Sequence, residues 1–339
     1  MTKNPKIYYL APDFDKPAGG IKVLYNHVDL LNELGYDASV LHSKKGFKST
    51  WFRNESKIAY FNEVIFSESD VIVIPEIYFH LLSAPKITQK ERLKKLIGHK
   101  LDYFTAKEIL KMSVKKVIFN QNAYHTLLDF TAELTPRTEY LENFTGYLSI
   151  SDHNKDYIQY IFPNLTIHRV KWSLDFNLLQ YQPDAKKKII SYMPRKNEDH
   201  VKQVISILKL RNNLEGYELM PIQNQNEAGV AEILNKSTIF LSFGYPEGLP
   251  LPPAEAMASG CYVIGYHGGG GQEYFKPEHS QTVPFGDIIT FCKEVEVAVK
   301  ISSVELKNKM EAASVFIRKH YSKEIEKELL NTSWQQILA

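Results

Sequence analysis

Two glutamates eight positions apart carry the strongest chemical signal in the sequence. Glu247 lies in a loop after an apolar run, and Glu255 lies in the first or second turn of the helix that follows. Gly248 gives the backbone freedom to approach a ligand. Pro252-Pro253 suits a helix start, because proline fixes a helical φ and lacks an N–H that would stay unpaired there. The free N–H groups of that helix start favour an anion, so the two carboxylates indicate a phosphorylated ligand rich in hydroxyl groups.

Glycine loops and a basic pair accompany the glutamates. Residues 267–271 place four glycines before another helical segment, and such a run is costly, because glycine destabilises ordered structure by about 0.5–1 kcal/mol relative to alanine. Arg195-Lys196 follows an apolar run; such a pair is either solvated or binds phosphate, for which the arginine fork is suited. Gly19-Gly20 precedes the first helix, where a glycine pair is commonly only a tight turn.

These residues lie on loops between strand-like apolar runs and amphipathic helical patterns, which is typical of α/β architecture with parallel sheets. Strands are expected at 6–11, 38–42, 71–74, 116–120, 147–151, 189–193, 218–223, 238–243 and 261–266. The segment 171–188, with Pro183 and a triple lysine, divides the strands into two series and is the expected linker. Ligands of doubly wound sheets bind beyond the carboxyl ends of the strands. The sequence therefore predicts two doubly wound α/β domains that face a cleft.

Length and composition agree with two globular domains. A chain of 339 residues suits two domains of roughly 150 residues each, and 44% hydrophobic with 24% charged residues is a globular balance. No apolar run approaches the ~18–20 residues of a membrane span, and the N-terminus leads directly into a strand without a signal peptide. Two cysteines, Cys261 and Cys292, cannot form a disulfide scaffold. We therefore expect a cytoplasmic protein.

The order of the motifs resembles a known family. Residues 247–273 contain Glu-x7-Glu, Gly-x-x-Val-Ile and Gly-Gly-x-x-Glu in turn. This pattern resembles the retaining glycosyltransferases of group 1, or family 4, whose GT-B fold has two Rossmann-like domains. The resemblance covers most of the chain and implies an acceptor-side domain at 1–170, the linker at 171–188, a nucleotide-sugar-binding domain at 189–321 and a final helix at 322–339 that crosses back to the first domain. The run 193–196 is also similar to bacterial rhamnosyltransferases.

The resemblance implies a role for each matching residue. Glu247 would touch the donor sugar, and Arg195 and Lys196 would stabilise the donor diphosphate, so these three are the expected catalytic residues. The expected donor-binding residues are Gly19, Gly20, Gly248, Leu249, Glu255, Gly269 and Gly270. Among these, the counterpart of Glu255 holds the ribose hydroxyls.

Two positions depart from the family pattern. Pro250 stands where the family often has a second glycine, and because proline lacks an N–H, a donor contact is lost or was never needed. The family's frequent histidine after the central strand of the first domain has no clear match; Asn122 and His125 are the two acceptor-side alternatives.

We expect a retaining, metal-independent enzyme that moves a hexose or deoxyhexose from a nucleoside-diphosphate sugar to an acceptor hydroxyl, without a further cofactor. We assign no Asp-x-Asp of the kind that holds Mg²⁺ on a sugar nucleotide, and no Cys/His cluster with zinc spacing is present in the sequence. Two alternatives stay open: a GT-B sugar-nucleotide epimerase, and a non-catalytic GT-B subunit that binds a glycan or a partner. A dinucleotide-binding oxidoreductase is disfavoured, because Gly19-Gly20 lacks the G-x-G-x-x-G spacing.

A basic stretch at 86–117 stands out in an otherwise balanced chain. It holds ten Lys/Arg against three Asp/Glu, a net charge of +7 in a chain whose total is +2. It is either a solvated helical face or a docking surface for a polyanion, such as an anionic membrane beside a lipid-linked acceptor or nucleic acid. The membrane alternative would give the protein a peripheral position at the inner membrane surface.

Overall fold

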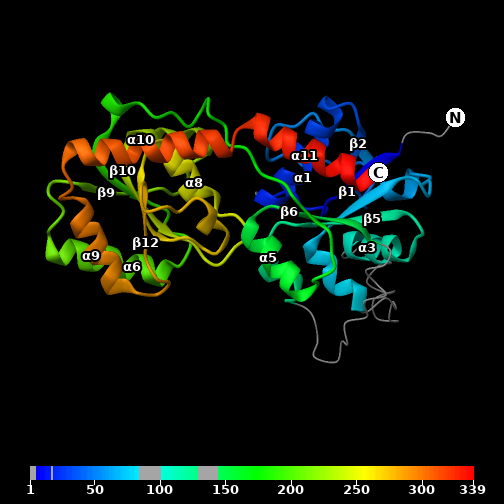
Figure 1. Ribbon diagram of the computed structural model, residues 1–339, viewed down its shortest axis with the longest axis horizontal. Coiled ribbons are helices and arrows are strands. Elements are labelled where there is room, and N and C mark those ends of the chain that lie inside the picture. The colour runs from blue at the N-terminus through cyan, green and yellow to red at the C-terminus, as the bar shows by residue number, and fades with distance from the viewer. Residues whose placement is uncertain (1–4, 17, 84–100, 129–143) are drawn as a thin grey trace. The chain divides into compact units, whose positions relative to one another are not determined.

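The computed structural model describes residues 5–16, 18–83, 101–128 and 144–339. The chain divides into two compact units. Unit 1 comprises Met1–Lys171 and Lys327–Ala339, and unit 2 comprises Trp172–Glu326. Each unit is built on one parallel sheet with helices on its faces (Figure 1), which confirms the predicted α/β class.

In unit 1, seven strands pair in the order β3-β2-β1-β4-β5-β6-β7. The strands are β1 (Lys6–Leu10), β2 (Asp37–His42), β3 (Ile58–Tyr60), β4 (Val71–Pro75), β5 (Lys115–Asn120), β6 (Phe144–Ser149) and β7 (Ile167–Arg169). The helical segments between them are α1 (Gly19–Glu33), η1 (Phe61–Glu63), η2 (Glu76–Ser83), α3 (Leu101–Lys111), α4 (Ala123–Thr126) and α5 (Asp152–Ile161).

Apolar strands buried on both faces hold unit 1 together. All five residues of β4 are buried, as expected for a central strand of a parallel sheet. Ile72 and Ile74 pack on one face with Ile109 of α3. On neighbouring β1, the Tyr9 hydroxyl accepts a hydrogen bond from Trp334 Nε1 at 3.2 Å, which docks the C-terminal helix α11 (Lys323–Leu338).

In unit 2, five strands pair in the order β12-β11-β10-β8-β9. The strands are β8 (Lys187–Tyr192), β9 (Glu218–Pro221), β10 (Ser237–Phe243), β11 (Tyr262–Tyr266) and β12 (Ser280–Thr282). The helical segments are η4 (Pro183–Ala185), α6 (Glu198–Arg211), α7 (Glu227–Lys236), α8 (Leu251–Ala258), η5 (Gly270–Glu273), α9 (Ile288–Ala298) and α10 (Ser303–His320).

The central strand β10 shows how both faces of this sheet are covered. Leu241 and Phe243 pack with residues of α6 and α9, whereas Phe240 packs with residues of α7, α8 and α10. Figure 1 shows α10 on one side of the sheet and α6 and α9 on the other. Cys261 and Cys292 are free and buried in these two cores.

The segment expected as a linker is ordered within unit 2. Lys187 and Lys188 already belong to β8, and the Lys186 ammonium donates to the carbonyl oxygens of Ser237 and Leu234 at 2.6 and 3.1 Å. Burial lowers the pKa of Lys186. The first lysine of the triple thus bonds inside the unit, and the other two are exposed residues of the strand.

The basic stretch also differs from a uniform charged face. Lys107 and Lys116 are buried, and the Lys116 ammonium donates to the carbonyl oxygens of Met112 and Val114 at 2.5 and 2.9 Å. Most of the other basic residues, including Lys90, Lys94 and Lys95, lie outside the described residues. Two of the ten cations are thus unavailable to any docking surface. Within the described part of the chain, no helix combines the length and the apolarity that a membrane crossing requires.

Candidate active site

The predicted catalytic residues meet at the carboxyl edge of the unit 2 sheet. Arg195 and Lys196 follow β8, and Glu247 follows β10, the neighbouring strand. Lys196 Nζ lies 2.5 Å from Glu247 Oε1, with 33% and 25% of the two side chains exposed. Arg195, the preceding residue in the chain, is exposed. The fold thus brings a cation and a carboxylate into contact where both stay open to a ligand.

Asn197 fixes the loop that carries the basic pair. It caps the start of α6 in the left-handed conformation, with φ 51°, which asparagine tolerates better than most residues. Its buried amide donates to the carbonyl oxygens of Phe243 and Gly244 at 2.7 and 3.2 Å. This clamp joins the ends of β8 and β10, and sequence reasoning missed it; an asparagine directly before an acidic helix start was the available signal.

The four-glycine loop packs directly against the loop of Glu247. The Glu247 amide donates to the Gly268 carbonyl at 2.8 Å, and the Gly270 amide donates back to the Glu247 carbonyl at 3.1 Å. A Cβ on Gly270 would lie 1.7 Å from the Gly248 carbonyl oxygen, so only glycine fits there. The Gly269 amide donates to His267 Nδ1 at 3.1 Å. These glycine amides are therefore engaged within the protein, and the loop positions Glu247 and Gly248.

Three carboxylates surround a buried tyrosine behind this loop. Burial raises the pKa of Tyr274 well above its usual value, and the negative charges of Glu247, Glu273 and Glu255 raise it further. The Tyr274 hydroxyl donates to the carbonyl oxygen of Pro250, the residue that caps α8. Pro250 therefore has a structural role of its own, and Glu255 lies half-buried on the helix that follows it. Leu249 packs against the same core.

A hollow beside the basic pair adds residues that the sequence did not single out. Its volume is about 800 Å³, and it opens at the carboxyl ends of β8 and β9. Arg195 lines its rim, Ile205 and Ile222 contribute apolar walls, and residues 223–225 bring side-chain amides. We call this feature the β8–β9 hollow. Apolar walls with a few amide groups suit a flat heterocycle, which needs stacking surface and edge hydrogen bonds.

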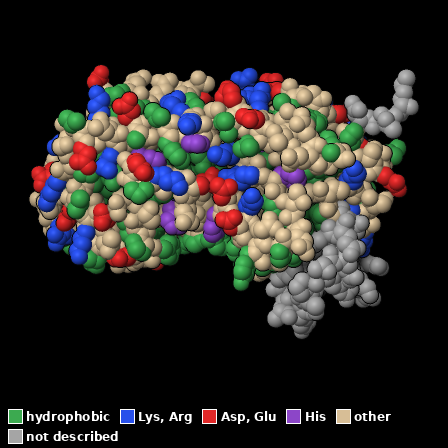
Figure 2. All heavy atoms as spheres, in the orientation of Figure 1, with side chains coloured by type: hydrophobic (Ala, Val, Ile, Leu, Met, Phe, Trp, Pro, Cys, Tyr) green, Lys and Arg blue, Asp and Glu red, His purple; other side chains and the backbone are tan. Residues whose placement is uncertain are grey.

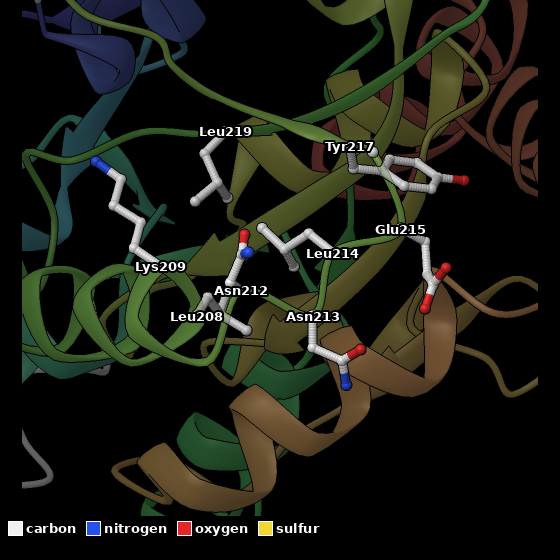
Figure 3. Close-up of a pocket in the computed structure, with 9 residues that line it drawn as sticks. Leu208, Lys209, Asn212, Asn213, Leu214, Glu215, Tyr217 and Leu219 are labelled. Atoms are coloured by element: carbon white, nitrogen blue, oxygen red, sulfur yellow. The ribbon is translucent and has the colours of Figure 1, made fainter.

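Another hollow lies at the opposite end of the sheet from Lys196 and Glu247. It has a volume of about 590 Å³ and is lined by Leu208, Lys209, residues 212–217 and Leu219, between the end of α6 and the start of β9 (Figure 3). This is the amino edge of the parallel strands, opposite to the edge where doubly wound sheets bind ligands. Among the described residues, no cluster of His, Cys, Asp or Glu is arranged to hold a metal ion.

Two expected donor-binding glycines and both acceptor-side candidates lie at the carboxyl edge of the unit 1 sheet. Gly19 and Gly20 begin α1 after β1, and Asn122 and His125 follow β5. Asn122 caps α4 by accepting from the Tyr124 amide at 3.2 Å, and its own Nδ2 lies 3.5 Å from His125 Nε2. His125 is exposed. Both residues share one loop.

Comparison with known proteins finds a matching family and a related enzyme. Residues 195–315 match the family "Glycosyl transferases group 1", which spans the basic pair, both glutamates and the glycine loop. An alpha-1,6-glucosyltransferase of Actinobacillus pleuropneumoniae serotype 7 is 26% identical over 261 residues, which cover 74% of this chain and 69% of that protein.

Solved structures share the fold over nearly the whole chain. Sucrose-phosphate synthase from Thermosynechococcus elongatus aligns with a TM-score of 0.65 at 13% identity, covering 98% of this chain and 99% of that one. HepE from Anabaena, solved with UDP and glucose, aligns with a TM-score of 0.62 at 13% identity, covering 98% and 100%. These findings identify the chain as a glycosyltransferase with the GT-B fold that uses a nucleoside-diphosphate sugar, and its residues 195–315 are similar to group 1.

Proposed function

We propose that this glycosyltransferase transfers glucose from UDP-glucose to a hydroxyl of a sugar acceptor. The observation that carries the proposal is the contact between Lys196 and Glu247, because it offers a cation to a phosphate and a carboxylate to a sugar hydroxyl at one place. The relative from Actinobacillus pleuropneumoniae is named a glucosyltransferase, and HepE was solved with UDP and glucose. These names favour glucose over other sugars and UDP over other nucleotides.

The order of the strands suggests how the donor lies in residues 189–321. The ends of β10, β8 and β9 are consecutive along the sheet edge, and neighbouring strands are about 4.8 Å apart. A nucleotide sugar laid along this edge would place its sugar at Glu247, its diphosphate at Arg195 and Lys196, and its base in the β8–β9 hollow. Glu255 would accept from the ribose hydroxyls, and the loop of Gly248 and Leu249 would flank the sugar.

The same side chains account for the chemistry. The bond from the anomeric carbon to the diphosphate breaks, and the electron pair leaves with the diphosphate, whose negative charge Lys196 and Arg195 stabilise. The acceptor oxygen forms its bond on the same face, and its proton passes to the departing phosphate oxygen. Glu247 would hold the donor sugar in place during this step, which is a positioning task.

Residues 1–170 would supply the acceptor side. Asn122 and His125 lie at one edge of the unit 1 sheet, where strand-end loops bind ligands. Gly19-Gly20 lies at the same edge and would contact the donor phosphate. The basic residues Lys90, Lys94 and Lys95, with others in 86–100, would favour a polyanionic or lipid-linked acceptor and a peripheral position at the inner membrane surface.

A donor panel tests the proposal. Melting temperatures are measured with UDP, UDP-glucose, GDP-mannose, ADP-glucose and dTDP-rhamnose, because specific binding raises apparent stability. We expect UDP and UDP-glucose to give the largest shifts in wild type and small shifts in Lys196→Ala. A larger shift with dTDP-rhamnose would instead support a rhamnosyltransferase, and no shift with any donor would support a binding subunit.

A further inference from the structure

A buried carboxylate lies at the acceptor-side edge of unit 1. Glu76 directly follows β4 and is 4% exposed. Its Oε2 accepts a hydrogen bond from the backbone N–H of Gln121 at 3.1 Å. β4 and β5 are neighbours in register, with Pro75 opposite Phe119. The two strand ends therefore bring this carboxylate under the loop that follows β5.

Backbone amides, rather than a basic side chain, stabilise the ionised form of this group. Burial raises the pKa of Glu76 to about 7, while hydrogen bonds from the backbone N–H groups of Gln121, Glu76 itself and Asn122 lower it. A carboxylate taken out of water is costly unless it is hydrogen-bonded. A residue needed only to fill space would not require an ionisable group here. The carboxylate is suited to gather N–H groups from a turn that would otherwise leave them unpaired.

The loop that Glu76 holds carries both acceptor-side candidates. Asn122 begins α4, and its amide group lies 3.5 Å from His125 Nε2. Gln121 extends toward the glycine pair, since a Cβ on Gly20 would lie 3.3 Å from Gln121 Oε1. One anchor point thus connects the loops that follow β4, β5 and β1.

We propose that Glu76 is a positioning residue for the acceptor: it holds the loop of Gln121 and Asn122 in the conformation that binds the acceptor sugar. This inference rests on the proposed acceptor role of unit 1. Glu76 touches neither donor nor acceptor; it acts through the loop. Loss of the anchor should weaken acceptor binding and leave donor binding in unit 2 unchanged.

Asp70 provides a matched control on the same strand. It precedes β4, is 5% exposed, and its carboxylate accepts from the backbone N–H groups of Lys6 and Ser67 at 3.0 and 2.9 Å. It is therefore also a buried carboxylate that holds two amides, but it lies at the amino edge of the sheet. Asp70→Asn measures the general effect of replacing a buried carboxylate by an amide. Glu76→Gln measures the effect of the same replacement at the acceptor-side edge of the sheet.

The test compares full-length wild type, Glu76→Gln and Asp70→Asn. Glucosyl transfer is measured from UDP-glucose to p-nitrophenyl β-glucoside, and amide hydrogen exchange is followed at Gln121 and Asn122. In Glu76→Gln we expect the acceptor KM to rise about tenfold or more, with the KM for UDP-glucose within about twofold, because a misplaced binding loop affects one substrate. The two amides should exchange at least about tenfold faster. Asp70→Asn should leave both KM values and these two exchange rates near wild type.

Glu76→Met guards against a variant that fails to fold, because an apolar side chain of similar length removes the cost of a buried charge. Its backbone N–H groups lose their acceptor, so some stability is lost, but a cooperative melting transition verifies that the variant folds. It should still show the raised acceptor KM and the faster exchange. The inference is overturned by unchanged exchange at Gln121 and Asn122, by equal rises in both KM values, or by the same effects in Asp70→Asn. Failure of wild type to bind UDP-glucose would reject the proposed function instead, while the exchange rates would still decide whether Glu76 anchors the loop.

Discussion

Lys196 and Glu247 neutralise each other at a 2.5 Å contact, yet about a third and a quarter of the two side chains remain exposed. In the proposed mechanism a phosphate oxygen would replace the carboxylate as partner of Lys196, and Glu247 would then be free for a sugar hydroxyl. The pair keeps both charges oriented before the donor arrives. Such preorganisation is what electrostatic stabilisation of a leaving group requires.

Removing either basic side chain should slow the reaction strongly. Lys196→Ala and Arg195→Ala are each expected to lower kcat by about 10²-fold, because each removes one positioned charge from the developing diphosphate. Lys236→Ala is the control, since Lys236 forms an exposed ion pair with Glu232 on α7. Steady-state rates with UDP-glucose give the comparison, and kcat values within twofold of wild type would contradict the assigned role.

The two glutamates should divide their effects between binding and turnover. Glu255→Gln should mainly raise the KM for the donor, because a ribose contact is the same in the ground and transition states. Glu247→Gln should mainly lower kcat, because its contact lies beside the reacting sugar. EDTA should leave the rate of wild type unchanged, because we expect the enzyme to be metal-independent. If both variants changed kcat and KM by the same factors, this division of roles would be rejected.

At the scale of elements, the loops after β8, β10 and β11 form one fixed assembly. Asn197 ties the loop after β8 to the end of β10. Gly270 lets the backbone of the loop after β11 contact the backbone of the loop after β10. The functional side chains therefore stand on loops whose own backbone hydrogen bonds are satisfied inside the protein. This rigidity explains why so many glycines occur in so few residues.

Gly270→Ala should disrupt this assembly. Its Cβ would collide with the Gly248 backbone, so we expect a loss of about 1–3 kcal/mol in the free energy of unfolding, as for overpacked sites. Gly19→Ala is the stability control, because a Cβ there meets nothing within 4 Å. Urea unfolding of both variants measures the difference. Equal stability of the two variants would show that the close approach of the loops is not required.

The elements could be predicted from the sequence better than their contacts. Four of the five strands of unit 2 were predicted within a few residues, because apolar runs bounded by turns identify buried strands. The short strand β12 was not predicted. The donor motif remains a prediction; it could be made from the sequence because its residues are close together along the chain. The roles of Asn197 and Glu76 were missed, since each bonds to a loop far along the chain. The burial of Lys116 was missed for the same reason: counting charges does not show where an ammonium group finds its carbonyl oxygens.

At the scale of the whole molecule, charge is balanced except in one stretch. The net charge is +2, and on the face shown in Figure 2 basic and acidic side chains intermingle over both units. The excess of +7 at 86–117 therefore remains the distinguishing electrostatic feature, with Lys107 and Lys116 removed from it by burial.

Neutralising part of that stretch should weaken acceptor binding and leave donor binding unchanged. With a polyanionic or lipid-linked acceptor, replacing Lys90, Lys94 and Lys95 by Gln should raise the acceptor KM at low salt and leave the donor KM unchanged. The difference should shrink as salt rises, because exposed charges are screened within about 10 Å at 0.1 M ionic strength. Acceptor KM values at two salt concentrations provide the measurement, and identical values at low salt would assign the stretch to a solvated face.

The most direct test of the central claim is to follow UDP-glucose with wild type and with Lys196→Ala by proton NMR, in the absence of acceptor and at high enzyme concentration. Water then replaces the acceptor, so the result depends only on the donor site. We predict that wild type releases UDP together with glucose that appears first as the α-anomer, and that Lys196→Ala releases it about 10²-fold more slowly. First appearance of the β-anomer, or equal rates in the two proteins, would contradict a retaining transfer at the site of Lys196 and Glu247.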